Sequence, residues 1–285
     1  MSLVETISSP APLARLASTA SVEATPRAAL AARDLGAMLP EGGDLYIPHL
    51  PGAAFEATWR AAAAAAGAGL RPVPHVSARG TRAADVLTRE LQALRETGAD
   101  AAMLVGGGGV QEGPFADAEA LLASGALQRA GFRRLGLAAH PEGHPHADAA
   151  ALDRALDAKL RLARGFAEEV WLVTQFAFEA APVLDWLARL RRREPDILVR
   201  VGVSGPARPA TLLAYAARCG VGASLQALKG RPGLIGRMTR RWRPDALAGR
   251  LAEAAAAGET GPIALHLFPF GGLEATADWL EEARA

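Results

Sequence analysis

Eight short apolar runs, rich in β-branched residues and spread over the whole chain, are the feature that most constrains the fold. Several of them are apolar over many consecutive residues, as in EVWLVTQF and LVRVGVSG. A strand that is buried on both faces has this composition, and such strands are typical of parallel sheets. The predicted strands are Ser21–Ala24, Asp44–Leu50, Arg71–Ser77, Ala101–Gly106, Arg134–His140, Glu169–Phe176, Leu198–Ser204 and Ile263–Phe270.

Helical patterns separate these runs, so that strand and helix alternate eight times. Residues 81–97 show the pattern well, because Val86, Leu87, Leu91 and Leu94 recur at helical spacing. Such alternation predicts parallel strands that are joined by right-handed crossovers. Helices are predicted over residues 26–39, 53–69, 81–97, 117–130, 148–167, 180–193, 209–218, 244–257 and 273–284, with 244–257 as an extra helix before the last strand.

The length of the chain favours closing these units into one barrel. Its 285 residues are close to the roughly 250 residues of one (β/α)8 TIM barrel with small additions. We therefore predict a single α/β domain over residues 1–285, with a core of about 20–284 and an N-terminal extension over 1–19. An open doubly wound sheet is the alternative, but it would need a glycine-rich phosphate loop after an early strand, which the sequence lacks.

The overall composition is that of an ordinary globular enzyme. Hydrophobic residues make up 50% of the chain, charged residues 21%, and the net charge is +1. Proteins that bind nucleic acid concentrate basic residues on one surface, so this balance predicts no nucleic-acid partner. No apolar run approaches the roughly 20 residues that span a bilayer, and the single cysteine, Cys219, excludes an intramolecular disulfide. We expect a cytoplasmic protein without membrane association.

Polar and ionisable residues gather where the predicted strands end. Active sites of (β/α)8 barrels lie at the C-terminal ends of the strands, so these side chains should meet around one pocket. Burying such groups costs desolvation free energy, which favours a functional role for them. They are Glu23, His49, His75, Gly106 to Gly109, His140, Glu142, His144, Thr174, Gln175 and Ser204.

The segment AAHPEGHPHAD at residues 138–148 is the densest of these strand ends. A metal site at His140, His144 and His146 is one interpretation, but two prolines break the helix that would align the ligands, so no metal is predicted. The other interpretations are a surface loop rich in turn-forming residues and a rigid loop that holds a cofactor.

Five short motifs, HPEGHP, LDAKL, VTQF, SVEATPR and PHVSA, lie at or beside the predicted strand ends. In their order along the chain, SVEATPR, PHVSA, HPEGHP, LDAKL and VTQF, and at these places, they resemble the methylenetetrahydrofolate reductase family over about residues 20 to 280. The resemblance implies FAD at the C-terminal face of the barrel, reduced by NADH or NADPH. The flavin would then pass hydride to 5,10-methylenetetrahydrofolate and give 5-methyltetrahydrofolate. Family members are often oligomers, so we also expect a homo-oligomer that binds a small folate substrate.

The resemblance further implies roles for individual residues. Glu23 matches an acid that helps to open the folate ring to an iminium, and Gln175 matches a glutamine that contacts the pterin ring. The other implied substrate contacts are Thr174, Phe176, Phe268 and Phe270. The implied cofactor contacts are His49, His75, Gly106, Gly107, Gly108, His140, Glu142, His144 and Lys159.

Several of these residues also have a purely structural interpretation. Glu23 could cap the helix that begins at Pro26, His75 could be a core histidine, and Lys159 could be a lone charge on an exposed helix face. The run VGGGG could be a flexible turn, although four glycines let backbone amides approach a ring or a phosphate closely.

Four segments, which follow predicted strands two, four, seven and eight, differ from the family pattern. Val105 and Gly107 stand where members carry the arginine and aspartate of an RGD motif beside the flavin, and no aromatic residue stands at the expected place after strand seven. Three functions therefore stay open. They are a flavin-dependent methylenetetrahydrofolate reductase, a tetrahydrofolate-binding enzyme without flavin that transfers methyl or methylene units in demethylation, and a non-catalytic homologue.

Overall fold

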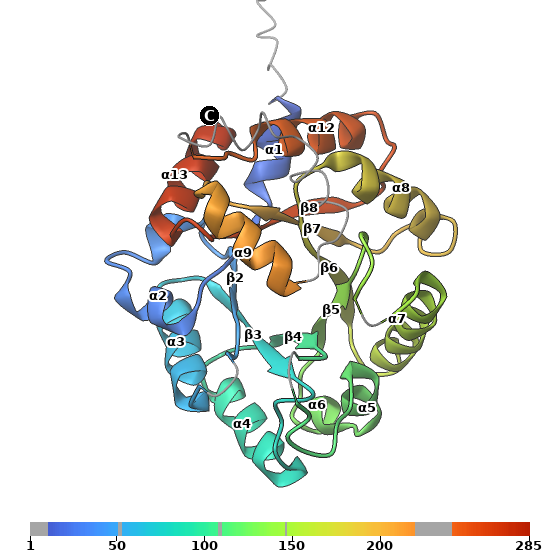
Figure 1. Ribbon diagram of the computed structural model, residues 1–285. Helices are drawn as coiled ribbons and strands as arrows, with labels where there is room; N and C mark the ends of the chain where they lie inside the picture. The colour runs from blue at the N-terminus through green and yellow to red at the C-terminus, as the bar shows by residue number, and fades with distance from the viewer. Residues whose placement is uncertain (1–10, 51–52, 108–109, 146, 220–240) are drawn as a thin grey trace, which may run out of the picture.

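Eight parallel strands close into a barrel in the order in which they occur along the chain. The computed structural model describes residues 11–50, 53–107, 110–145, 147–219 and 241–285. Figure 1 looks into the barrel, with the strands at the centre and the helices around them. The predicted (β/α)8 barrel is thus confirmed, and the open sheet is wrong. The strands are β1 (Ser21–Glu23), β2 (Asp44–Ile47), β3 (Arg71–Ser77), β4 (Ala101–Val105), β5 (Arg134–Ala139), β6 (Glu169–Ala177), β7 (Val199–Ser204) and β8 (Ile263–Phe268).

The helices that follow the strands cover the outside of the barrel. Their apolar faces pack against the outward-facing strand residues in one large core, for which Leu87, Leu91 and Leu94 on one helix are representative. The helices are α1 (Pro12–Ser18), α2 (Pro26–Ala31), α3 (Phe55–Gly67), α4 (Ala84–Glu96), α5 (Ala118–Ala123), α6 (Ala126–Arg129), α7 (Ala149–Arg164), α8 (Ala180–Arg191), α9 (Pro209–Cys219), α12 (Asp245–Ala256) and α13 (Leu273–Arg284), with a 3₁₀ turn η1 at Gly36–Met38.

A second, smaller core fills the middle of the barrel. The indole N–H of Trp171 on β6 donates a 2.7 Å hydrogen bond to the hydroxyl of Tyr46 on β2, across the barrel. Val73 and Met103 pack around this pair. Gly136 on β5 leaves the space for the indole, since a Cβ there would lie 3.0 Å from the Trp171 Nε1 atom. This packing closes the middle of the barrel and leaves the space for a ligand at the C-terminal ends of the strands.

Helix α1 and an ion-pair layer close the opposite end. Asp44 pairs with Arg200 on β7 and with Arg71 on β3. Arg200 also donates to the carbonyl oxygen of Thr19, just after α1, at 3.4 Å. Helix α1 buries Leu16 and lies against α12 and α13. The extension was predicted over residues 1–19, and the structure describes it from residue 11. Most of this described part is packed on the barrel through α1.

Four predicted boundaries were wrong for local reasons. The helix predicted over 26–39 ends at Ala31, because the chain turns extended at Ala32 and the Asp34 carboxylate binds the amide of Ala37 at 3.0 Å. The helix predicted over 117–130 is split into α5 and α6 by Gly125, which has a φ of 71°. Strands β2 and β8 end before Pro48 and Pro269, which have no amide hydrogen for the ladder.

Among the described residues, the helices are too short or too polar to cross a membrane. The sole cysteine, Cys219, is the last residue of α9.

Candidate active site

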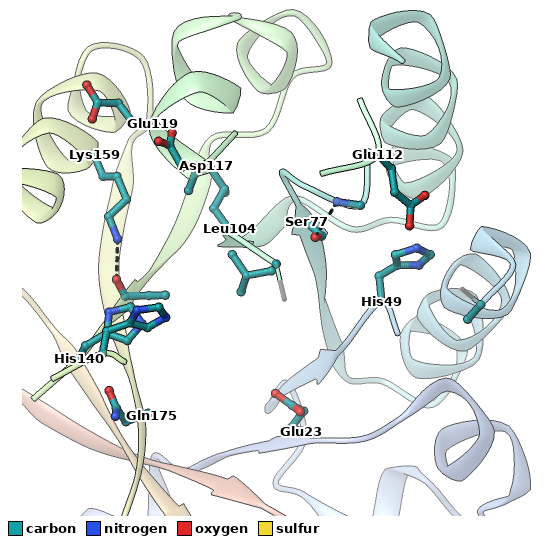
Figure 2. Close-up of a pocket in the computed structure, with 18 of the residues that line it drawn as sticks. Glu23, His49, Ser77, Leu104, Glu112, Asp117, Glu119, His140, Lys159 and Gln175 are labelled. Carbon is teal, nitrogen blue, oxygen red and sulfur yellow. Dashed lines mark hydrogen bonds between the residues drawn. The ribbon is translucent and has the colours of Figure 1, made fainter. Parts of the chain in front are cut away.

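A cavity of about 1040 Å³ opens at the C-terminal ends of the strands. Figure 2 shows Glu23 at its base, Gln175 and His140 on one side, His49 on the other, and Lys159 reaching down from above. The structure brings most of the predicted residues together here, although Gly108 lies outside the described residues. The predicted residues that line the cavity are Glu23, His49, Gly106, Gly107, His140, His144, Lys159, Gln175, Phe176, Phe268 and Phe270.

Glu23 is the last residue of β1 and points into this space between two histidine rings. Its Oε2 atom lies 3.5 Å from Nε2 of His75 and 3.8 Å from Nε2 of His266. Burial raises the pKa of the Glu23 carboxyl, and His75 opposes this rise by a smaller amount. The cap of α2 is Thr25, whose hydroxyl accepts the amide hydrogen of Ala28, so the capping interpretation of Glu23 is wrong. A carboxyl whose pKa is raised by burial suits a proton donor.

His266, in the middle of β8, is a neighbour of Glu23 that the sequence analysis missed. Its Nδ1 atom lies 2.9 Å from the Ser21 hydroxyl, and its ring meets Tyr46 edge-on at 4.4 Å. Burial lowers the pKa of His266 to about 3, helped by the charge of Arg200. The sequence contains one signal for it. His266 stands two residues before Phe268 on the same strand, so the two side chains point to the same side, but only residues at strand ends were considered.

His75 stands beside Glu23, inside the barrel, and is not part of the lining of the large cavity. Its ring faces Tyr46 at 6.2 Å, and burial lowers its pKa. The Nε2 atom of His75 is buried without a hydrogen-bond partner, since 3.5 Å to Glu23 is too long. This placement makes His75 a neighbour of the acid rather than of a ligand in the cavity.

A bulge between β6 and β7 turns both Gln175 and Phe176 toward the cavity. The strand register shifts between Val173 and Phe176, and the Thr174 hydroxyl fills the irregularity by accepting the amide hydrogen of Gly202 at 2.8 Å. Thr174 therefore supports the strand and does not line the cavity. The Gln175 amide nitrogen donates to the carbonyl oxygen of Gly143 at 3.3 Å, while its Oε1 atom is buried and accepts no hydrogen bond.

Lys159, on α7, is buried beside the loop that follows β5. Its Nζ donates to the carbonyl oxygen of Ala138 at 2.6 Å, and the residue is only 8% exposed. The interpretation as a lone charge on an exposed face is therefore wrong. Burial lowers the pKa of Lys159 to about 8, against the opposing charge of Asp117.

The loop after β5 brings His140 and His144 into edge-on contact, with their rings 5.2 Å apart. Burial, together with the charges of Lys159 and His144, lowers the pKa of His140 to about 4, so the ring is neutral near pH 7. Glu142 in the same loop does not line the cavity. His146 lies outside the described residues, within which no three metal-ligating side chains form a cluster.

Four aromatic rings form one wall of the cavity. Phe268 and Phe270, from the end of β8, stack at 5.7 Å, and Phe176 meets Phe270 edge-on at 4.8 Å. Tyr215 on α9 stacks on Phe270 at 4.1 Å and remains 38% exposed. Tyr215 was not predicted, because it stands on the helix that follows β7 and not a few residues after the strand, where an aromatic residue was expected.

The opposite wall is acidic. Glu90, Glu112, Asp117 and Glu119 all line it, and Arg82 is paired with Glu112 at 3.1 Å. Burial lowers the pKa of His49 on this wall. None of these acids was predicted, because they lie on helices and loops beyond the strand ends.

Gly106 and Gly107 form the edge of the cavity above β4. Gly107 has a φ of 83°, a conformation that side chains rarely adopt. A Cβ atom added to Gly107 would also collide with the Ser77 hydroxyl oxygen. The aspartate that the RGD pattern places at this position would therefore be strained in this backbone conformation.

No family model matches the chain. A solved structure with a similar fold is an uncharacterised protein from Clostridium thermocellum that binds two copies of 5-methyl-5,6,7,8-tetrahydrofolic acid. Its TM-score is 0.64, with 12% sequence identity over 93% of this chain and 94% of that chain. Tryptophan synthase from M. tuberculosis has a TM-score of 0.48, 14% identity, and coverage of 96% and 97%. The first likeness shows the barrel fold, and the second carries no argument.

The buried histidines predict that the protein loses stability in mild acid. An unfolded histidine has a pKa of about 6.5, whereas those of His140 and His266 are about 4 and about 3. Between these values the unfolded chain binds protons that the folded chain does not, so the free energy of unfolding falls as the pH falls. Glu23 acts in the opposite direction, because the folded chain keeps its proton longer.

We expect urea unfolding to show a stability roughly 1–3 kcal/mol lower at pH 5 than at pH 7. The variant His266→Phe should show a smaller difference between the two pH values. Equal or greater stability at pH 5 in the unaltered protein would contradict the neutral state of these rings.

Proposed function

We propose that this chain is a barrel enzyme that binds a reduced folate in the large cavity and acts on the one-carbon unit that the folate carries. The observation that carries the proposal is the position of Glu23, a partly buried acid with a raised pKa at the base of a cavity that has an aromatic wall and an unpartnered amide oxygen. The similar fold of a protein that binds 5-methyltetrahydrofolic acid supports the choice of ligand, as do the motifs quoted above.

Gln175 supplies the polar contact that a pterin ring requires. Its Oε1 atom accepts no hydrogen bond within the protein, and its amide nitrogen retains a second hydrogen beside the one given to Gly143. A pterin edge presents donors and acceptors side by side, which one amide can pair. A ligand that donates a hydrogen bond to this buried oxygen would remove the desolvation cost that the unpaired oxygen adds to the free energy of the unliganded protein.

The aromatic wall supplies the stacking surface for the flat rings of a folate. Tyr215 is the exposed member, while Phe268 and Phe270 lie beneath it at the cavity wall. Stacking of aromatic rings adds about 0.5–1.5 kcal/mol beyond the burial of their area. The volume of about 1040 Å³ is at the upper end of the range of small-molecule pockets, roughly 300–1,000 Å³.

The proposed role of Glu23 is to give and take one proton. Protonation of N10 in 5,10-methylenetetrahydrofolate by the carboxyl lets the bond between the methylene carbon and N10 break, with its electron pair going to N10. The lone pair of N5 then forms the second bond to the carbon, which becomes an iminium and an acceptor for a hydride or a nucleophile. Burial of the carboxyl provides the protonated form that this step consumes.

The described residues do not fit FAD well. A diphosphate needs uncommitted cations or amides, yet Lys159 donates to Ala138, and Arg82 is paired with Glu112. Four carboxylates face the same space, and the backbone conformation at Gly107 would strain the acid that accompanies the flavin in the resembling family. We therefore favour the flavin-independent hypothesis, in which NADH or NADPH is the hydride donor of a reduction or a methyl group is transferred.

The variant Gln175→Leu should weaken the binding of 5-methyltetrahydrofolate by about tenfold, because the pterin loses its partner without loss of side-chain volume. Isothermal titration calorimetry at pH 7 measures the dissociation constant. The matched control is Gln128→Leu, an exposed glutamine on α6, which should leave affinity unchanged. Unaltered affinity in Gln175→Leu, or no binding by the original protein, would contradict the proposal.

Absorption spectroscopy tests the flavin-independent hypothesis. We expect the freshly purified protein to be colourless and to leave the fluorescence of added FAD unquenched, because the described cavity offers its diphosphate carboxylates rather than free cations. The same preparation should bind 5-methyltetrahydrofolate. A yellow protein that holds one flavin per chain would restore the flavin-dependent reductase.

A further inference from the structure

The carboxyl of Glu23 lies between the Nε2 atoms of His75 and His266. Each of these nitrogens can either donate or accept a hydrogen bond, depending on where its ring carries the hydrogen. His75 Nε2 and His266 Nε2 approach the same oxygen, Oε2, at 3.5 and 3.8 Å. Both distances exceed a hydrogen bond, and in unliganded enzymes such contacts are often long and tighten when the ligand arrives. Which of the three groups holds a proton decides whether this cluster presents an acid or a base to the cavity.

Ser21 restricts the choice through the far side of the His266 ring. Its buried hydroxyl lies 2.9 Å from His266 Nδ1 and 3.4 Å from the carbonyl oxygen of Leu265. The hydroxyl has one hydrogen to donate, while the carbonyl can only accept. When Ser21 donates to Leu265, His266 carries its hydrogen on Nδ1 and gives it to Ser21. The Nε2 atom then turns a lone pair toward Glu23.

The opposite arrangement places the hydrogen on His266 Nε2, which would then donate to Glu23 and favour a carboxylate. Burial works against that arrangement, because an ionised carboxylate loses its hydration at the base of the cavity. With the hydrogen on Nδ1, the Nε2 lone pair faces a protonated Glu23 carboxyl across 3.8 Å, and the carboxyl can donate to it once the two groups draw together around a ligand. In one state the His266 hydrogen is on Nδ1 and the Glu23 carboxyl is protonated. In the other state the His266 hydrogen is on Nε2 and the carboxyl is ionised.

We propose that Ser21 and His266 are positioning residues, which hold the imidazole in its Nδ1–H form so that Nε2 accepts from and orients the protonated Glu23 carboxyl. Glu23 remains the group that would meet the ligand, and His266 acts through it. The inference rests on the proposed function for the identity of that ligand only. The hydrogen positions themselves are properties of the protein without ligand.

The other groups around Glu23 and His266 do not reverse this arrangement. His75 faces Glu23 from β3, and its lowered pKa keeps it neutral at pH 7. Tyr46 on β2 presents its ring to both histidines, and its hydroxyl is engaged by Trp171. Asp44 and Arg200 act on His266 from the closed end of the barrel with opposite signs, and they are paired with each other.

Nuclear magnetic resonance of the full-length protein tests the inference without any ligand. Nitrogen-15 shifts of the His266 ring, assigned from their loss in His266→Phe, report which nitrogen carries the hydrogen. We expect Nδ1–H and a bare Nε2 from pH 5 to pH 8, since burial lowers the pKa of His266 to about 3. Carbon-13 shifts of the Glu23 carboxyl, assigned with Glu23→Gln, report its titration midpoint.

The variant Ser21→Ala removes the acceptor that fixes the ring. The imidazole can then move its hydrogen to Nε2 and stabilise the carboxylate, so the Glu23 midpoint should fall by about 0.5–1 pH unit. The matched control is Ser204→Ala. Ser204 is a fully buried serine on β7, the strand that pairs with β8, and its hydroxyl donates to the carbonyl oxygen of Gly205. It should leave the midpoint where it is.

An Nε2–H tautomer in the original protein would overturn the inference, as would equal Glu23 midpoints in Ser21→Ala and the original protein. Should Ser21→Ala fail to fold, the tautomer of the original protein still decides the question. Calorimetry with 5-methyltetrahydrofolate is a separate measurement. Absence of folate binding together with an Nδ1–H ring would reject the proposed function and leave the positioning role standing.

Discussion

Closure of the barrel around Glu23 is the constraint on which the rest of the site depends. Strand β1 is only three residues long, and it is held between β2 and β8, so the last residue of the strand is fixed at the rim. The rings of His75, from β3, and His266, from β8, flank the carboxyl of Glu23, whose side chain is 20% exposed toward the cavity. Desolvation then favours the neutral acid. An open sheet would leave this carboxyl hydrated and ionised.

The sequence predicted the barrel and much of its rim, for a physical reason. Strands buried on both faces have to be apolar throughout, so a polar residue such as Glu23 or Gln175 at the end of such a run stands out. The residues that were missed lack this contrast. His266 lies inside an apolar strand, and Tyr215 and the acidic residues stand on helices whose approach to the cavity depends on tertiary packing. The inward turn of Phe176 depends on a bulge that the pattern does not reveal.

Three features of the cavity differ from the pattern of the reductase family that the sequence resembles. At Gly107, the backbone conformation and the contact with Ser77 would strain any side chain, a carboxylate included. Lys159 lines the cavity and gives one hydrogen to the carbonyl oxygen of Ala138, so it also supports the loop after β5. The wall opposite the aromatic rings carries four carboxylates and Arg82, which is paired with one of them. The cavity thus has an aromatic side, which suits a pterin in our proposal, and an acidic side.

The central claim is that a reduced folate binds with its reactive nitrogens at Glu23, and a crystal structure of the complex with 5-methyltetrahydrofolate tests it most directly. The account predicts pterin density within hydrogen-bond distance of the Gln175 amide, a folate ring against Tyr215 and Phe270, and the N5-methyl group turned toward the Glu23 carboxyl. A folate bound outside this cavity, or one whose pterin points away from Glu23, would contradict it.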